Sequence, residues 1–286
     1  MPRIAYVNGR YVAHADASVH IEDRGYQFAD GVYEVCEVAR GFIVDMPRHL
    51  GRLGRSLAEL SIDWPVTQRV LPLILREVVR RNHVVNGLVY VQVTRGVASR
   101  DFVFPANAKP SLVVTARKAD PAAAVKRAET GIKVITVPEN RWDRVDIKTV
   151  GLLPNVLAKQ KAKEAGAQEA WFVDSDGMVT EGGSSNAWIV TTDGVLVTRP
   201  AEHGILRGIT RTTLFDVAAK LGLKIEERGF SVAEAKAARE AFISSATTIA
   251  MPIVAIDGAP VANGHPGSVT LSLREAFFDI AEKSPA

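Results

Sequence analysis

Short runs of alternating apolar residues, separated by turn residues, recur along both halves of the 286-residue chain. IAYVNGRYV (4–12) carries Asn8-Gly9 between two such runs, which is the strongest short signal for a β-hairpin. GVYEVCEVARGFIVDM (31–46) repeats the pattern around Arg40-Gly41. Few of these runs alternate regularly with helices, so the pattern favours hairpins and meanders over a doubly wound parallel sheet. The sequence therefore predicts an α+β protein.

Helical spacing of apolar residues predicts helices over 48–62 and 66–84. A third helix is predicted within 210–227, where Thr210 is the N-cap, Gly222 ends the helix and a strand follows. Residues 120–130 are small, polar and poorly periodic. We interpret them as a linker between an N-terminal domain (1–119) and a C-terminal domain (131–286).

Charge and cysteine content exclude several classes of protein. The 35 basic and 32 acidic residues give a net charge of +3 without a basic block, which argues against nucleic-acid binding. The single cysteine, Cys36, excludes an internal disulfide and a zinc site with two or more thiolates, and no metal site is expected. No uncharged apolar run of membrane-spanning length occurs, so the sequence predicts a soluble cytoplasmic protein.

Lys148 in VDIKTVGLLPN (145–155) stands apart from the helix-surface lysines that follow it. An amine at the end of an apolar approach can act as a nucleophile toward carbonyls, although a surface lysine is the commoner case. In TEGGSSNAWIV (180–190), Glu181 precedes two glycines, which would let the main chain approach a planar ligand. An ordinary glycine-rich hairpin is the alternative interpretation.

Three further segments could bind an anion. Arg52 lies on a predicted helix with Arg48 and Arg55, and it would be a fixed cation if it pointed inward. Gly208-Ile209-Thr210 leads into a helix, where free backbone N–H groups collect anions. FISSATTIAMP (242–252) supplies a cluster of hydroxyl groups, although such clusters are more often polar loops.

Six motifs occur in the order found in one known family. They are EDRGYQFADGVYEV (22–35), HLGRLGRS (49–56), QVTRGVASR (92–100), DIKTVGLLPNVLAKQKAKEAG (146–166), VTEGGSSNAWIV (179–190) and GILRGITR (204–211). Over essentially its whole length the chain resembles the fold type IV, branched-chain-like family of pyridoxal phosphate aminotransferases. The resemblance implies a smaller N-terminal α/β domain and a larger C-terminal pseudo-barrel domain, with pyridoxal 5′-phosphate between them.

The resemblance also implies roles for individual residues. Lys148 would be the Schiff-base lysine that holds the cofactor and later moves the Cα proton of the substrate. Glu181 would face the pyridine nitrogen and keep it protonated, because a carboxylate partner favours the charged form. Arg52 would bind the phosphate by a charge-assisted fork. The remaining phosphate contacts would come from Ile209, Thr210, Ser245 and Thr247.

Within the family, the 92–105 segment is most similar to the D-amino-acid aminotransferases. Arg100 matches their arginine for the substrate carboxylate, and Tyr33 matches the tyrosine beside the substrate and cofactor. The chain departs from the pattern at Phe102, where that branch has a histidine, and at Ala246, where a hydroxyl is common. Leu153 stands where branched-chain L-specific enzymes usually have a tyrosine, which favours the D-specific branch.

The resemblance implies a homodimeric transaminase that moves the amino group of D-alanine or D-glutamate to 2-oxoglutarate or pyruvate. The alternatives are a branched-chain L-amino-acid aminotransferase, an aminodeoxychorismate lyase of the same fold, and a non-enzymatic anion- or sugar-binding protein in which Lys148 is structural.

Overall fold

The computed structural model describes residues 3–202 and 204–286, and the chain divides into two compact units. The N-terminal unit extends to Pro121 and also contains Ile147–Gly151 and Glu282–Ala286. The C-terminal unit contains Ala122–Asp146 and Leu152–Ala281. The segment that carries Lys148 thus belongs to the N-terminal unit, whereas the sequence analysis placed Lys148 in the C-terminal domain (131–286).

The predicted linker, 120–130, contains a helix, α4 (Pro121–Thr130), which its weak periodicity did not indicate. Alanine has the highest helix propensity, and proline is favoured at the first helical position. Ala128 is buried in the core of the C-terminal unit, so one face of α4 packs against that unit. The helix gives little apolar periodicity in the sequence, because it packs against the core through an alanine and not through large apolar residues.

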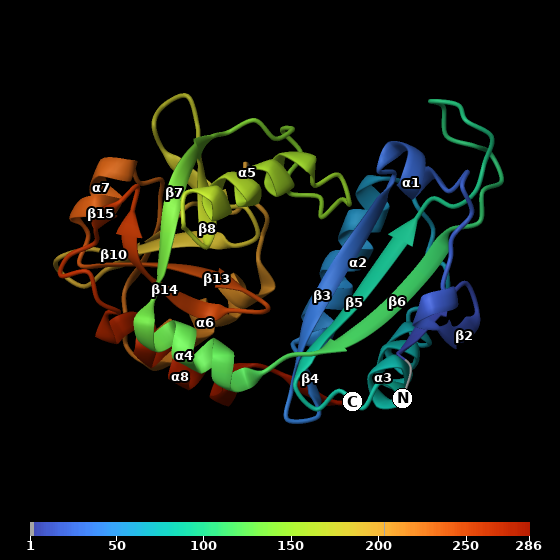
Figure 1. Ribbon diagram of the computed structural model, residues 1–286, viewed down its shortest axis with the longest axis horizontal. Coiled ribbons are helices and arrows are strands. Elements are labelled where there is room, and N and C mark those ends of the chain that lie inside the picture. The colour runs from blue at the N-terminus through green and yellow to red at the C-terminus, as the bar shows by residue number, and fades with distance from the viewer. Residues whose placement is uncertain (1–2, 203) are drawn as a thin grey trace. The chain divides into compact units, whose positions relative to one another are not determined.

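The N-terminal unit is built on one antiparallel sheet, in which the described residues form seven strands in the order β16-β4-β3-β5-β6-β1-β2 (Figure 1). Its elements are β1 (Ile4–Val7), β2 (Arg10–Ala13), η1 (His14–Asp16), α1 (Arg24–Phe28), β3 (Gly31–Ala39), β4 (Phe42–Val44), α2 (Met46–Glu59), α3 (Leu71–Arg81), β5 (Gly87–Thr94), β6 (Ser111–Lys118) and β16 (Lys283–Pro285).

The expected first hairpin is confirmed. Asn8 and Gly9 both have positive φ angles, +44° and +94°, as a two-residue type I′ turn requires, and β1 pairs with β2 across them. Helices α2 and α3 cover one face of the sheet (Figure 1). Leucines of α2 and α3 are fully buried there, and each contributes about 1.5–3 kcal/mol through burial.

Successive side chains along the strands of this sheet point alternately to the face that the helices cover and to the opposite, open face. On β3, Val32, Glu34 and Cys36 are fully buried, whereas Tyr33 and Val35 are only half-buried. Successive side chains of a strand point to opposite faces, so Tyr33 lies on the open face. This alternation determines which site residues can meet.

The C-terminal unit contains a mixed sheet with the order β12-β11-β10-β13-β14-β7-β8-β9, and β15 pairs with β14. Its further elements are β7 (Ile132–Pro138), α5 (Leu153–Glu164), β8 (Glu169–Val173), β9 (Val179–Gly182), β10 (Asn186–Val190), β11 (Leu196–Thr198), α6 (Ile209–Lys220), β12 (Ile225–Glu227), α7 (Val232–Ala237), β13 (Glu240–Ser245), β14 (Ile249–Ile256), β15 (Ala259–Pro260) and α8 (Ser268–Ile280).

This second sheet curls on itself. Strand β9 ends the order on one side, yet it contacts β10, the third strand from the other side. A flat sheet could not bring these strands together, so the unit has the expected barrel-like form. Helices α6 and α8 pack against each other and against β13 (Figure 1).

Helix α6 begins at Ile209, two residues earlier than a helix capped by Thr210 would begin, and the assignment of Thr210 as its cap is wrong. Gly208 is the N-cap, and Thr210 is a buried residue of the first turn. The helix ends as expected before Gly222, which has a φ of +69°.

Buried Glu240 at the start of β13 caps helix α8 from a distance. Its carboxylate accepts hydrogen bonds from the backbone N–H groups of Val269 (2.9 Å) and Thr270 (2.8 Å). Side-chain caps of this kind stabilise a helix by about 0.5–2 kcal/mol.

In the described parts of the chain, every helix is too short or too polar to cross a membrane.

Candidate active site

Lys148 is presented on the open face of the N-terminal sheet by the segment Ile147–Gly151. The backbone of this segment pairs with the start of β3, because Tyr33 N–H donates to the Lys148 carbonyl (3.0 Å) and Val150 N–H donates to the Gly31 carbonyl (3.0 Å). The half-buried Lys148 Nζ donates to Tyr33 Oη at 3.3 Å and lies 4.3 Å from the centroid of the Tyr33 ring. Among the described residues Lys148 forms no salt bridge, and the hydroxyl group of Tyr33 is the partner of its amine.

Tyr33 is itself held by its neighbours on the open face. Its ring stacks on that of Tyr90 with centroids 5.6 Å apart, and Tyr90 Oη donates to Gln92 Oε1 at 2.7 Å. Burial, with a smaller contribution from Tyr33, raises the pKa of the Tyr90 phenol well above its usual value. Tyr90 therefore remains a neutral hydrogen-bond donor that fixes the position of Tyr33.

Arg52 points inward from α2 toward the covered face of the same sheet. Its guanidinium donates from Nε to Glu34 Oε1 (2.6 Å) and from Nη2 to Glu34 Oε2 (2.8 Å). The fork that was expected to bind a phosphate is thus engaged by a carboxylate of β3. Arg55, one turn further along α2, is an exposed arginine near Glu59.

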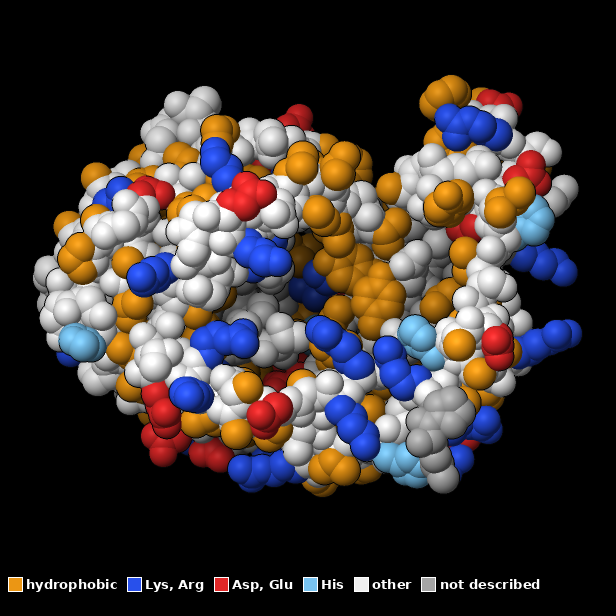
Figure 2. Space-filling model, in the orientation of Figure 1, with side chains coloured by type: hydrophobic (Ala, Val, Ile, Leu, Met, Phe, Trp, Pro, Cys, Tyr) orange, Lys and Arg blue, Asp and Glu red, His pale blue; other side chains and the backbone are white. Residues whose placement is uncertain are grey.

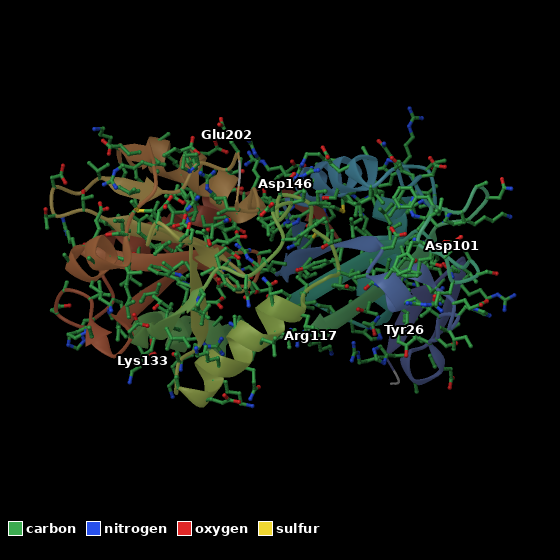
Figure 3. All side chains as sticks on the ribbon, turned by 90° about the horizontal axis from the view of Figure 1, so that it is seen from above. Tyr26, Asp101, Arg117, Lys133, Asp146 and Glu202 are labelled. Atoms are coloured by element: carbon green, nitrogen blue, oxygen red, sulfur yellow. The ribbon has the colours of Figure 1, made fainter. Side chains whose placement is uncertain are left out.

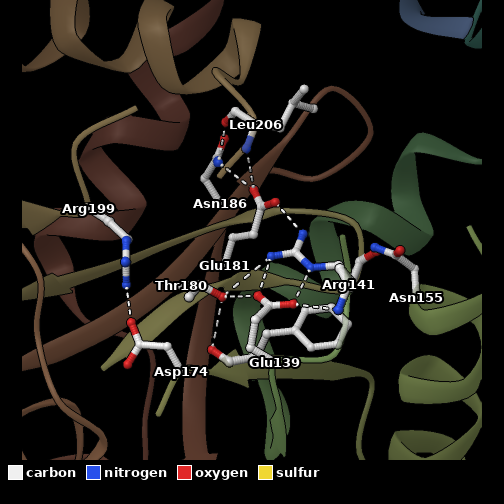
Figure 4. A network of polar contacts seen from close by, with 11 residues as sticks. Glu139, Arg141, Asn155, Asp174, Thr180, Glu181, Asn186, Arg199 and Leu206 are labelled. Atoms are coloured by element: carbon white, nitrogen blue, oxygen red, sulfur yellow. Dashed lines mark hydrogen bonds and ion pairs between the residues drawn. The ribbon is translucent and has the colours of Figure 1, made fainter. Parts of the chain in front are cut away.

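Glu181 lies in the C-terminal unit, where side-chain and backbone groups donate to its carboxylate (Figure 4). Arg141 Nη1 donates to Oε1, while Asn186 Nδ2 (3.1 Å) and the Leu206 N–H (3.2 Å) donate to Oε2. Glu181 is 5% exposed. A charged donor on Oε1 and two neutral donors on Oε2 fix the orientation of this carboxylate.

Arg141 connects Glu181 to a second carboxylate, Glu139. It donates to Glu139 from Nε (2.8 Å) and Nη2 (2.6 Å), and Thr180 Oγ1 donates to Glu139 at 2.7 Å. Burial alone would lower the pKa of Arg141, but its hydrogen bonds to Glu139 and the charge of Glu181 outweigh burial and raise it. Arg141 is therefore a permanent cation beside Glu181, and Figure 4 shows the whole chain of contacts.

The N-terminus of α6 is packed against the same asparagine that contacts Glu181. A Cβ on Gly208 would lie 2.0 Å from Asn186 Oδ1, so only glycine allows this approach. Asn186 Nδ2 also donates to the Leu206 carbonyl at 2.9 Å. Ile209 and Thr210, the first two helical residues, are thereby placed in the same unit and near the contacts of Glu181.

The glycine-rich turn after Glu181 is explained by packing within the protein. A Cβ on Gly182 would lie 2.3 Å from Ser185 Oγ, and one on Gly183 would lie 3.0 Å from Glu169. Ser184 and Ser185 both donate to the buried Glu169 at 3.1 Å. Packing within the protein thus requires a small residue at both positions.

The expected hydroxyl groups of the 242–252 loop contact one another. Ser245 Oγ lies 2.8 Å from Thr248 Oγ1 and 3.4 Å from Thr247 Oγ1, at the turn between β13 and β14. Ala246 interrupts this cluster as the sequence indicated. Whether Ser245 and Thr247 bind phosphate stays a prediction.

Arg100 lies on an exposed loop of the N-terminal unit. Its Cζ is 4.5 Å from the centroid of the Phe28 ring, and the ring of Phe102 lies 5.6 Å from the same ring. Arg24 Nη1 donates to the Asp101 carbonyl at 2.6 Å, which ties the loop to α1. Phe102 thus packs on Phe28 beside Arg100.

Apolar side chains gather on this loop and beside it. Phe102 is 83% exposed and Val103 is 71% exposed, and exposed Tyr26 on α1 adds to them. Figure 3 shows Tyr26 and Asp101 at the same end of the N-terminal unit, and Figure 2 shows hydrophobic side chains on the projecting loop. We call these residues the apolar end of the unit.

The chemistry of the donor set fits pyridoxal 5′-phosphate. An amine without an ion-pair partner among the described residues suits an aldehyde, and an oriented carboxylate suits a ring nitrogen. A guanidinium and a helix N-terminus are each suited to a phosphate. Lys148, Glu181 and Arg52 provide these groups.

Comparison with known proteins identifies the family. The model described as "Amino-transferase class IV" matches residues 31–256. The chain is 40% identical over 270 residues to the D-alanine aminotransferase of Bacillus licheniformis, covering 94% of each protein. It is 40% identical over 274 residues to that of Listeria innocua, covering 96% of this chain and 94% of the relative.

Among solved structures, the branched-chain amino acid aminotransferase of Escherichia coli has a TM-score of 0.90 at 24% identity, covering 98% of this chain and 95% of that one. The chain belongs to the class IV aminotransferases and has their two-domain α+β fold, as the sequence predicted. Enzymes of this class depend on pyridoxal phosphate, which confirms the expected cofactor.

Sequence reasoning missed four residues that hold the expected ones in place. Arg141 lies seven residues before Lys148, in the loop that follows β7. Its contact with Glu181 depends on the path of that loop, which no sequence pattern indicates. The alternation of apolar and polar residues along β5 was the signal that could have placed Tyr90 on the same face as Tyr33. No local signal pointed to the others. The four residues are Glu34, Tyr90, Arg141 and Asn186.

Proposed function

We propose that this aminotransferase moves the amino group of a D-amino acid to a 2-oxo acid, for example from D-alanine to 2-oxoglutarate, giving pyruvate and D-glutamate. The observation that carries the proposal is the amine of Lys148, which contacts Tyr33 and, in the described part of the chain, no carboxylate. The D-specific choice is supported by 40% identity to D-alanine aminotransferases over nearly the whole chain. The branched-chain structure matches at an identity that carries the fold alone.

The residues of this chain divide the work as follows. Lys148 Nζ would attach the cofactor and take the proton from the substrate Cα, with Tyr33 Oη orienting the amine. Glu181 would accept a hydrogen bond from the ring nitrogen and favour its protonated form. Arg52 would bind the phosphate, with N–H groups at the start of α6 and the hydroxyl groups of Ser245 and Thr247. Pyridoxal phosphate, when bound, supplies the electron sink for the carbanion formed at Cα.

A panel of half-reactions tests the function. The purified holoenzyme is mixed with single amino acids, and loss of the absorption band of the lysine-linked cofactor is followed without an amino acceptor. We expect D-alanine and D-glutamate to discharge the band and L-leucine to leave it intact. Discharge by L-leucine alone would instead identify a branched-chain enzyme. Pyruvate release from aminodeoxychorismate without an acceptor would identify a lyase.

The carboxylate role of Arg100 is tested separately. Replacing Arg100 with alanine should raise KM for D-alanine by about ten- to a hundredfold, because a charged hydrogen bond contributes roughly 1.5–3 kcal/mol. The cofactor band should be unchanged, since Arg100 is assigned to the substrate. Arg117→Ala removes another exposed arginine of the same unit and is the matched control. Equal KM values in both variants would remove Arg100 from the site.

We also propose a homodimeric, cytoplasmic enzyme. The apolar end of the N-terminal unit exposes large side chains that a second copy would cover. The single, buried Cys36 agrees with a reducing compartment. Light scattering coupled to gel filtration measures the mass directly.

A further inference from the structure

A buried ion cluster lies between β3 and α2 in the N-terminal unit. Glu34 is 0% exposed, and it accepts two hydrogen bonds from Arg52 and lies 2.7 Å from His49 Nδ1. Arg52 and His49 are three residues apart on α2, so they share one helix face. The cluster is defined here as Glu34, His49 and Arg52.

The charges of this cluster are strongly coupled. Burial would raise the pKa of Glu34, but the charge and hydrogen bonds of Arg52, aided by His49, hold it far below its usual range. Burial would lower the pKa of Arg52, but Glu34 outweighs it and raises that pKa. Both groups are therefore ionised.

Stability alone is a weak explanation for these charges. Exchanging a buried ion pair for apolar residues of similar volume is often neutral or stabilising, because desolvation offsets the attraction. What the pair does define is geometry. Two parallel N–H bonds to one carboxylate fix the plane and direction of a guanidinium.

The position of Glu34 on β3 links the cluster to Lys148. Tyr33 precedes Glu34, so the two side chains point to opposite faces of the sheet. Tyr33 contacts Lys148 on the open face, and Glu34 holds Arg52 on the covered face. One strand thus places the partner of the amine and the partner of the guanidinium at adjacent residues.

We infer that Glu34, supported by His49, is a positioning residue that orients the Arg52 guanidinium for the phosphate of the cofactor. The inference rests on the proposed function, which assigns the phosphate to Arg52. The sequence analysis expected the paired N–H groups of Arg52 to bind the phosphate. In the structure Nε and Nη2 donate to Glu34, and this contact sets the orientation of the guanidinium.

The test compares binding of pyridoxal 5′-phosphate and of pyridoxal, which lacks the phosphate, to enzyme stripped of its cofactor. Glu34→Asp keeps the charge but shortens the side chain, so the fork cannot be held in the same place. We expect its Kd for pyridoxal phosphate to rise by about ten- to a hundredfold, with the Kd for pyridoxal unchanged. Inorganic phosphate should lose potency as a competitor in parallel.

Glu34→Gln keeps the length of the side chain and loses one accepted hydrogen bond. The ratio of its Kd for pyridoxal phosphate to its Kd for pyridoxal should rise by less than that of Glu34→Asp. This variant answers the question by itself if Glu34→Asp does not fold. Asp30→Asn is the matched control, because Asp30 accepts bonds from two buried arginines, Arg24 and Arg95. Its unfolding temperature should fall while the ratio of the two Kd values stays at the wild-type value.

Two results would overturn the inference. One is a wild-type ratio in both Glu34 variants. The other is tighter binding of pyridoxal phosphate by Glu34→Gln, since Glu34 would then oppose the phosphate and not orient its partner. If the wild-type protein binds pyridoxal phosphate no more tightly than pyridoxal, the proposed phosphate site fails, whatever Glu34 does.

Discussion

A Lys148→Ala variant loses the absorption band of the lysine-linked cofactor and at least about 10⁴-fold in kcat/KM. Lys148 is expected to supply both the amine that attaches the cofactor and the base that moves the Cα proton, and alanine supplies neither. Tyr33 Oη, its partner at 3.3 Å, is a poor substitute because a phenol cannot form an imine with the cofactor. Difference spectra and steady-state kinetics with D-alanine measure the two losses independently.

Lys161→Ala is the control for this variant, because Lys161 is an exposed lysine of α5. Its band and turnover should match those of the wild type. A Lys148→Ala protein that retained both the band and turnover would remove Lys148 from the chemistry.

Replacing Glu181 with glutamine should lower kcat by about ten- to a hundredfold. A neutral amide no longer favours the protonated ring nitrogen, and a charged hydrogen bond of this kind contributes roughly 1.5–3 kcal/mol. The substitution also leaves Arg141 with one carboxylate, Glu139, instead of two. Single-turnover kinetics with D-alanine, together with the position of the cofactor band, measure the effect.

Glu240→Gln separates this effect from general destabilisation. Glu240 is another buried glutamate of the C-terminal unit, and its bonds cap α8. This variant should unfold at a lower temperature and keep its turnover. If the two variants had equal kcat values at a temperature where both are folded, the role of Glu181 would be contradicted.

Hairpins, most helices and the family could be predicted because they depend on local signals. Asn8-Gly9 determines a turn through two positive φ angles, and Gly222 ends α6 for the same reason. The linker prediction differed from the structure because helix α4 packs through alanines, which carry little periodic signal. Thr210 was assigned as a cap because it has the right chemistry, but Gly208 precedes it and can approach Asn186.

The sequence by itself determined the chemistry that is available: an isolated lysine, a lone carboxylate before a glycine-rich turn, an arginine on a helix and a glycine-led helix start. Only the tertiary structure decided the partners of these groups. Glu34 meets Arg52 because the alternation of β3 turns that carboxylate toward α2, and Arg141 meets Glu181 across 40 residues of chain. Such pairings depend on strand register and helix packing, and no local pattern of residues encodes them.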